Sequence, residues 1–248
     1  MILRVLGSSS RGNCYLLQSE KTGEVLILEA GVKIATIKKA LIFNVEKVVG
    51  CIITHEHGDH AKSAADLANA FIPVYMSEGT AKAKHLEHVS TVHMVQPLKA
   101  FSVGSFDIMP FPTEHDAAQP YGYLIKHPEC GCVLFATDTY YLRYRFPGVT
   151  NIMIECNYSL DKLRDNMAKG LIDHKRYNRT IKSHMSYQTC METLMANDLT
   201  KVNNIVLIHL SADNSNADEF RKGIERVTHK NVVVAEPAMR LTFNKTPY

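Results

Sequence analysis

The sequence predicts an α/β (α+β) protein in which two β-sheets pack together with helices on the outside. Three observations predict this class: strands outnumber helices, helices fall between groups of strands, and no Pro-, Gly- or Ser-rich linker separates the two halves. A chain of 248 residues that is 46% hydrophobic and 21% charged can bury a substantial core. We therefore expect one domain that spans residues 1–248.

Short apolar runs between turns predict the strands of the first third. These runs are Leu3–Leu6, Cys14–Gln18, Val25–Glu29, Val48–Thr54 and Ile72–Met76. The unbroken apolar character of Val48–Thr54 predicts a strand buried on both faces, and Pro73 limits the last run to an edge or a strand start. Helical spacing of small and apolar residues predicts a helix over Lys62–Phe71, and a second helix is expected over Glu78–Leu86.

The second part of the chain repeats this pattern of strands followed by helices. Predicted strands cover Phe106–Pro112, Tyr121–Lys126, Val133–Thr137, Asn151–Cys156 and Ile205–Ile208, with closing strands at Asn231–Ala235 and Arg240–Phe243. Helices are expected over Leu160–Ala168 and Tyr187–Ala196, which Ser159 and Ser186 can cap, and an amphipathic helix over Asn216–Val227.

Several features predict a cytoplasmic protein without a membrane span. No run approaches the roughly 18 apolar residues that a span needs, and the start of the chain lacks the basic-then-apolar pattern of a signal peptide. The six scattered cysteines indicate reduced core residues. Cys130 and Cys132 could supply two of the four cysteine ligands of a metal site, but the sequence has no second closely spaced pair of cysteines.

Four apolar runs each lead into a residue that can bind a metal ion. These residues are His55, His115, Asp138 and His209. Strands that run the same way bring their ends to one edge of a sandwich, so residues distant in sequence can converge on one site. A single histidine after a strand is usually an ordinary, partly buried side chain, but this repetition indicates a metal centre.

The run from His55 to His60 is the densest part of this pattern. His55 and His57 are two residues apart and can face one metal, while Gly58 permits a sharp turn that brings Asp59 and His60 toward a second. Mixed imidazole and carboxylate ligands suit zinc, with manganese or iron as substitutes, and Asp138 is the natural bridging carboxylate. Two such ions ~3.5–4 Å apart can share a hydroxide and stabilise charge on an attacked oxygen.

In this pattern the chain resembles the metallo-β-lactamase-fold hydrolases, and among them the small bacterial and phage hydrolases of the YycJ/WalJ type. Beyond the His55 run, the resemblance is carried by residues 7–14, 114–117, 136–139, 184–186 and 209–211. It implies a four-layer αββα sandwich with two zinc ions, or manganese in their place. The implied ligands are His55, His57 and His115 for one ion, Asp59, His60 and His209 for the other, and Asp138 as the bridge.

The resemblance also implies catalytic roles for Asp59, Asp138 and His184. In phosphodiesterases of this fold, a histidine in a His-x-Ser setting contacts the scissile phosphate or protonates the leaving oxygen, and His184–Ser186 matches it. The alternative is a histidine at a helix start with Ser186 as a plain cap. Glu29 stands where the family usually has Asp, which affects the residues around the ligands rather than the ligands themselves.

Other polar residues have two interpretations each. Asn13 and Asn157 are either polar neighbours of the metals or ordinary turn residues. The remaining histidines follow no predicted strand end and are expected at the surface: His85, His88, His93, His127, His174 and His229.

Charge and aromatic residues bear on the substrate. Residues 159–185 contain seven Lys or Arg and three Asp, a net of +4, whereas the whole chain carries only +3. This segment is either a solvated helical hairpin or a flap that attracts phosphate. Tyr140, Tyr141, Tyr144, Tyr121 and Tyr123 are either base-stacking residues or tyrosines of the core and the sheet surface.

We expect phosphodiester hydrolysis, with a cyclic mononucleotide of the cCMP or cUMP type as the favoured substrate. By the resemblance, phage anti-Pycsar proteins cleave such nucleotides to evade immunity, whereas YycJ/WalJ relatives are 5′-to-3′ DNA exonucleases, which is the alternative. The modest net charge offers little groove for duplex DNA. A glyoxalase II-like thioester hydrolase shares the seven ligands and is the alternative from another reaction class. Both groups of phosphodiesterase relatives form homodimers, which is expected here.

Overall fold

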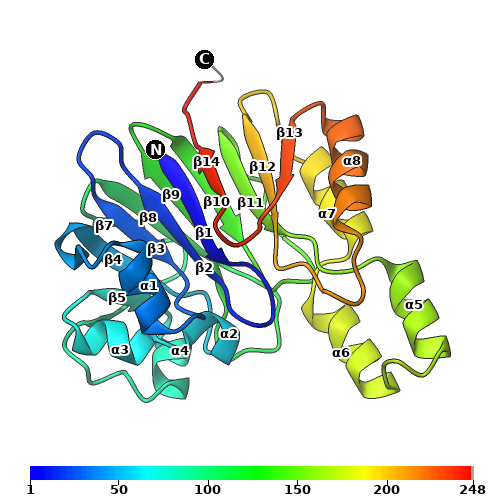
Figure 1. Cartoon of the computed structure of the whole chain (residues 1–248), viewed down its shortest axis with the longest axis horizontal. Helices are drawn as coiled ribbons and strands as arrows, with labels where there is room; N and C mark the ends of the chain where they lie inside the picture. The colour runs from blue at the N-terminus through cyan, green and yellow to red at the C-terminus, as the bar shows by residue number, and fades with distance from the viewer. Residues whose placement is uncertain (247–248) are drawn as a thin grey trace.

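Two seven-stranded β-sheets lie face to face in the computed structural model, which describes residues 1–246 (Figure 1). The first sheet has the order β14-β1-β2-β3-β4-β5-β6, with β1 (Ile2–Gly7), β2 (Cys14–Gln18), β3 (Val25–Leu28), β4 (Val48–Ile52), β5 (Val74–Met76), β6 (Val92–Met94) and β14 (Arg240–Thr242). The second has the order β13-β12-β11-β10-β9-β8-β7, with β7 (Phe101–Val103), β8 (Phe106–Pro112), β9 (Tyr121–His127), β10 (Gly131–Ala136), β11 (Asn151–Glu155), β12 (Asn204–Ile208) and β13 (Asn231–Val234).

The apolar core lies in three layers because successive side chains of a strand point to opposite faces of its sheet. In β12, Val206 and Ile208 join the core between the two sheets, whereas Ile205 and Leu207 pack on the outer face. In β2, Tyr15 and Leu17 face the inner core in the same way. Burial on both faces explains why these strands are continuous apolar runs.

Helices cover both outer faces. The first sheet is covered by α1 (Ile34–Ala40), α2 (Gly58–Ala61), α3 (Ala64–Asn69) and α4 (Glu78–Ala83), and the second by α7 (Tyr187–Met195) and α8 (Ala217–Thr228). The remaining pair, α5 (Leu160–Ala168) and α6 (His174–Ser183), forms a hairpin that projects from one end of the sandwich (Figure 1). The expected four-layer αββα arrangement is therefore confirmed.

Most predicted elements are present within one to three residues of their expected ends. Ser159 and Ser186 cap α5 and α7 as predicted, since their side chains accept hydrogen bonds from the backbone N–H groups of Lys162 and Thr189. The sequence did not predict α1, α2, β6, β7 or the short 3₁₀ helix η1 (Val45–Lys47), which have three to seven residues, too few for a clear periodic pattern. It indicated α6 only through the helical-hairpin interpretation of residues 159–185.

Expectations for individual side chains are largely confirmed. All six cysteines are buried and free, and five of the six histidines expected at the surface are exposed. The prediction for His127 is wrong: it is only 6% exposed because Ser105 Oγ lies 2.9 Å from its Nε2 and the Glu129 amide donates to its Nδ1. Among residues 1–246, no helix is long and apolar enough to cross a membrane.

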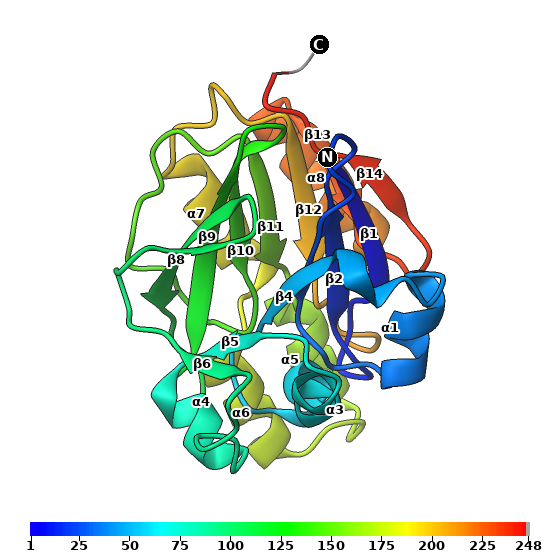
Figure 2. The same cartoon turned by 90° about the vertical axis from the view of Figure 1, so that its left-hand side faces the viewer.

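Parallel strands set the position of the loops that follow them. β10, β11 and β12 run parallel to one another in the second sheet, as do β3 and β4 in the first. Their carboxyl ends point toward the edge of the sandwich where α5 and α6 lie (Figure 2), and α2 lies at the same edge (Figure 1). The loop after β4 is fixed there by backbone hydrogen bonds, because the carbonyl of Asp59 accepts from the amide of Asn13 at 2.7 Å.

Gly31 makes this loop packing possible, which predicts a stability effect. A Cβ at Gly31 would overlap the carbonyl oxygen of Asp59 and lie 2.7 Å from the amide nitrogen of Asn13. We expect Gly31→Ala to lower the free energy of unfolding by about 1–3 kcal/mol, as overpacking does, measured by chemical denaturation. Gly58→Ala is the matched control, because no atom lies within 4 Å of its added Cβ. Equal stability of the two variants would contradict this account.

Candidate metal centre

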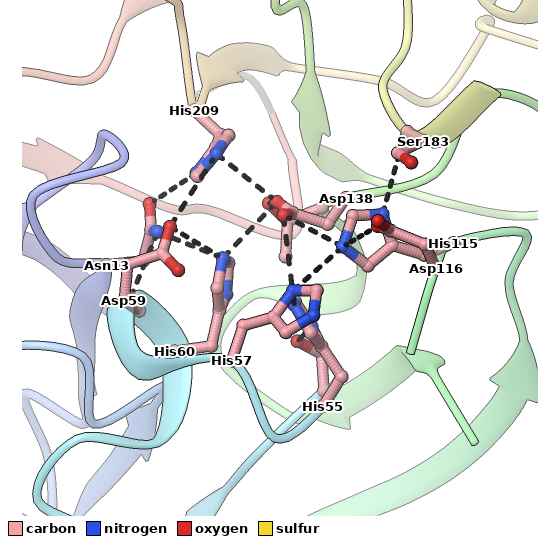
Figure 3. Close-up of polar contacts among 12 residues, drawn as sticks. Asn13, His55, His57, Asp59, His60, His115, Asp116, Asp138, Ser183 and His209 are labelled. Atoms are coloured by element: carbon pink, nitrogen blue, oxygen red, sulfur yellow. Dashed lines mark hydrogen bonds and ion pairs between the residues drawn. The ribbon is translucent and has the colours of Figure 1, made fainter. Parts of the chain in front are cut away.

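The seven side chains predicted to bind metal lie together at the edge of the sandwich where strands of both sheets end (Figure 3). The loop after β4 together with α2 carries four of them, and the segments after β8, β10 and β12 carry the other three: His55, His57, Asp59 and His60, then His115, Asp138 and His209. Their side chains point toward one another in Figure 3.

Three imidazole nitrogens and one carboxylate oxygen form the first set of donor atoms. Nδ1 of His57 lies 3.1 Å from Nε2 of His55 and 3.1 Å from Nε2 of His115. Oδ2 of Asp138 lies 3.5 Å from Nε2 of His115 and 3.8 Å from Nε2 of His55. Donor atoms of a tetrahedral zinc ion with bonds of ~2.0–2.1 Å are about 3.3–3.4 Å apart, so this spacing fits one divalent ion.

The other oxygen of Asp138 belongs to a second set. Nε2 of His60 lies 3.3 Å from Oδ1 of Asp138 and 3.4 Å from Oδ2 of Asp59. Nε2 of His209 lies 3.6 Å from Oδ1 of Asp138 and 3.9 Å from Oδ2 of Asp59. The Asp138 carboxylate therefore contacts both sets, one oxygen to each, as a bridging ligand does.

Hydrogen bonds to the outward nitrogens of His115 and His209 leave the inward nitrogens of these rings free to bind a metal. Nδ1 of His115 donates to the carbonyl of Ser183 at 2.7 Å, and Nδ1 of His209 donates to Oδ1 of Asn13 at 3.0 Å. Since each Nδ1 carries the proton, each Nε2 keeps a lone pair. Asn13 also lies 3.1 Å from Nε2 of His60 through its amide nitrogen. It is thus a polar neighbour of the centre rather than an ordinary turn residue.

Carboxylates surround His60 on both sides of its ring. Besides Asp59 and Asp138 at Nε2, the carboxylate of Glu29 lies 3.7 Å from Nδ1. Burial lowers the pKa of His60, but the charges of Asp138, Asp59 and Glu29 outweigh it and raise the pKa well above its usual value. This part of the centre therefore attracts positive charge, which a divalent cation supplies more fully than one proton.

Three of the histidines and the bridging carboxylate have the protonation states that metal binding requires. Burial lowers the pKa of His55 and His115, and it lowers that of His209 to about 4, so these rings are neutral at pH 7. Burial alone would raise the pKa of Asp138, but the imidazoles of His209 and His60 hold it well below its usual range. His55, His115 and His209 thus offer neutral imidazoles beside the ionised Asp138 carboxylate, whereas the neighbouring carboxylates keep His60 protonated.

The backbone turns sharply at three residues of the centre. Glu29, Asp138 and His209 have φ values of 66°, 45° and 54°, a left-handed conformation that is costly outside glycine. Glu29 follows β3 directly, His209 follows β12 directly, and Asp138 comes two residues after β10. Each turn aims a side chain inward, and Asn157 supports one of them by donating to the carbonyl of His209 at 2.8 Å.

His184 lies beside the donor atoms and is paired with a carboxylate that the sequence analysis missed. Its Nδ1 is 2.7 Å from Oε1 of Glu155 and 3.9 Å from Asp138, and its ring stacks on His209. Burial lowers the pKa of His184, but the charge and hydrogen bond of Glu155 outweigh it and raise the pKa to about 9. Glu155 is fully buried at the end of the apolar strand β11, a pattern that marks it in the sequence.

The basic hairpin of residues 159–185 borders the centre. The carbonyl that accepts from His115 belongs to Ser183, the last residue of α6. Arg179 of the same helix donates to the carboxylate of Asp116 at 2.9 Å. The hairpin is therefore attached to the residues next to the donor atoms and forms part of the rim.

The tyrosines divide into three groups. Tyr121 and Tyr123 are 1% and 0% exposed in the core between the sheets, so the base-stacking interpretation is wrong for them. Tyr144 packs against Phe111. Tyr140 and Tyr141 are 42% and 50% exposed and remain available to a ligand.

Comparisons with known proteins identify the family of this chain. The family described as "Beta-lactamase superfamily domain" matches residues 34–210. Exodeoxyribonuclease YycJ of Bacillus anthracis is 29% identical over 243 residues, which cover 90% of this chain and 87% of that protein. Exodeoxyribonuclease WalJ of Streptococcus pneumoniae is 28% identical over 225 residues, with 85% and 82% covered.

Solved structures show the same fold. The metallo-beta-lactamase fold protein YhfI from Bacillus subtilis superimposes with a TM-score of 0.73 at 20% identity, covering 97% of this chain and 99% of that one. A diphosphatase from the PhnP family gives a TM-score of 0.68 at 17% identity, with 97% and 96% covered. The chain therefore belongs to the beta-lactamase superfamily and is a hydrolase of the metallo-β-lactamase fold.

Proposed function

We propose that this protein is a metal-dependent phosphodiesterase that hydrolyses a nucleotide phosphodiester. The observation that carries this proposal is the Glu155–His184 pair, which lies within reach of Asp138 and His209 but is not among the seven predicted ligands. A protonated histidine at that position can donate a proton to a leaving oxygen, which a thioester hydrolase does not require because a thiolate leaves readily.

The seven donors would hold two zinc ions, or manganese in their place. When bound, such a pair lowers the pKa of a water molecule and offsets the charge that develops on a phosphoryl group. The protein's own part is to fix the donor atoms: the Asp138 carboxylate spans both sets, and the Ser183 carbonyl and the Asn13 amide orient two of the imidazoles. The side chain of Asp59 is 24% exposed, so its carboxylate is accessible to a substrate.

Acid catalysis falls to His184. Glu155 holds Nδ1 of the ring by a 2.7 Å hydrogen bond and keeps the imidazole protonated near neutral pH. The proton on the opposite nitrogen, Nε2, is then the one available to the leaving oxygen. The net charge of +4 in the hairpin draws a phosphate toward this side of the centre.

Two substrate classes fit this chemistry. The names of the two bacterial relatives, both exodeoxyribonucleases, favour an end of DNA. The modest net charge of +3 favours a cyclic mononucleotide of the cCMP or cUMP type, because duplex DNA requires a broad basic surface. We place the DNA end first, since the similarity to these relatives extends over most of the chain. The homodimer and the cytoplasmic location stay predictions.

The metal assignment predicts zinc content variant by variant. We expect the wild type to bind two zinc ions per chain, and His115→Ala and His209→Ala to lose about one each, since each variant removes a donor from one set. Asp138→Asn should weaken the binding of both ions, because its carboxylate contacts both donor sets. Elemental analysis after equilibrium dialysis measures the content. Thermal unfolding gives a second readout, since zinc at 100 times its Kd stabilises the folded state by ~2.7 kcal/mol.

The matched control for these variants is His93→Ala, which removes an exposed histidine of β6. It should retain both ions. Full zinc content in Asp138→Asn, or one ion in the wild type, would contradict the two-ion assignment.

The acid role of His184 predicts a dependence on the leaving group. His184→Gln should lower kcat by about 10²–10⁴-fold for a phosphodiester with an alkoxide leaving group. The loss should be small with a p-nitrophenolate leaving group, which needs no proton. Glu155→Gln should follow the same pattern, and His174→Gln, an exposed histidine of α6, should change neither rate. Zinc content should stay constant, and equal losses for both leaving groups would contradict the role.

The substrate class is tested by offering the zinc- or manganese-loaded protein three compounds side by side. These are duplex DNA with a labelled 5′ end, cCMP and S-lactoylglutathione. We expect release of nucleotides from the DNA or opening of cCMP, each followed by chromatography. Cleavage of the thioester alone would move the protein to the glyoxalase II-like class.

A further inference from the structure

We propose that a cavity next to the metal centre binds the nucleobase of the substrate, an inference that rests on the proposed phosphodiesterase function. The cavity has a volume of about 470 Å³, within the ~300–1,000 Å³ typical of small-ligand sites. It lies between the loop that follows Asp138 and helix α7. The residues that matter are Tyr140, Tyr141, Arg143 and Arg145 from the loop, and Thr189 and Glu192 from α7.

Both walls of this nucleobase cavity start at residues of the centre. Tyr140 is two residues after Asp138, so their Cα atoms are at most about 7.6 Å apart. Helix α7 begins directly after its cap Ser186, which is two residues after His184. A ligand whose phosphate lies at the centre therefore needs only the length of a nucleoside to reach the cavity.

One buried carboxylate ties the two walls together. Glu155 accepts a hydrogen bond from the amide of Thr139 at 2.9 Å, at the start of the loop, and from the amide of Met185 at 3.1 Å, ahead of α7. The same carboxylate holds His184. The position of the cavity is thus fixed relative to the group that would protonate the leaving oxygen.

The loop supplies both apolar and polar side chains to the cavity. Leu142 is 5% exposed and, with Tyr144, packs into the outer apolar layer of the second sheet while also lining the cavity. Tyr140, Tyr141 and Arg145 line it from the same loop and are exposed.

The exposed groups match the chemistry of a nucleobase. Tyrosine rings stack on bases, and a guanidinium group can stack on a base or contact its acceptors. Arg143 is already paired with Glu114 at 2.5 Å, whereas Arg145 has no ion-pair partner among residues 1–246. Thr189 and Glu192 add a hydroxyl and a carboxylate on the opposite wall, which suit the polar edge of a base. Leu142 and Ala196 also line the cavity and can contact the face of a base.

The test compares two ligands that share a phosphate. Isothermal titration calorimetry with the zinc-loaded protein measures the affinity for thymidine 5′-monophosphate and for methyl phosphate. We expect the nucleotide to bind at least tenfold more tightly. Tyr140→Ala and Tyr141→Ala should each weaken nucleotide binding, one of them by about tenfold, the scale of base stacking, and Arg145→Ala by a smaller factor. None should alter methyl phosphate binding.

Met195→Ala is the matched control, because Met195 is a 55% exposed residue of α7 that does not line the cavity. It should leave both affinities unchanged. Equal affinity of the wild type for the two ligands, or unchanged nucleotide binding in both tyrosine variants, would overturn the proposal. Because this experiment measures binding, it distinguishes failure of this proposal from failure of the proposed function. Tight nucleotide binding without hydrolysis of any phosphodiester would contradict the proposed function but would still support the cavity as the nucleobase site.

Discussion

The carboxylate of Asp138 is the group on which the rest of the centre depends, because one of its oxygens faces each set of donor atoms. Its partners come from different sheets: His115 and His209 follow strands of the second, and His60 lies on α2 after the first. A shift of one sheet against the other by a fraction of an ångström would separate the sets. The apolar core between the sheets therefore acts as the frame that holds the geometry.

This frame buries charge, which affects stability as well as chemistry. Glu29, Asp138 and Glu155 are all at most 3% exposed, and an unpaired buried carboxylate costs several kcal/mol. Hydrogen bonds from neighbouring groups offset this cost. Glu29 accepts from the amide of Thr54, and Glu155 accepts from two amides and from His184. Asp138 accepts a hydrogen bond from the hydroxyl of Thr137 and faces the protonated ring of His60, whose proton competes with metal. Folding stability and metal occupancy are consequently coupled.

How much of the fold and the metal centre could be predicted from the sequence depends on how far apart the interacting residues are in the chain. The ligand residues were predictable because they follow apolar runs. The end of a strand can be recognised from the residues next to it in the sequence. Glu155 was missed because its role appears only once β11 lies beside the segment that carries His184, although a lone Glu ending an apolar strand was a usable signal. His127 was misassigned for a similar reason, since its partner Ser105 is distant in the sequence.

The metal donors are held by the two sheets, whereas the surrounding loops and helices form the rim of the centre. This division explains why the donors do not determine the substrate. The seven donors follow strand ends and turns whose positions the two sheets fix, so they specify metal chemistry and little else. The groups that can distinguish substrates lie on the loop of residues 139–146, on the start of α7 and on the α5–α6 hairpin, where side chains can change without disturbing the core. Glu155 is the exception, because it contacts both the proton donor and the loop. A change in the loop that moved the Thr139 amide would therefore alter the acid as well as substrate binding, which couples specificity to rate at this one carboxylate.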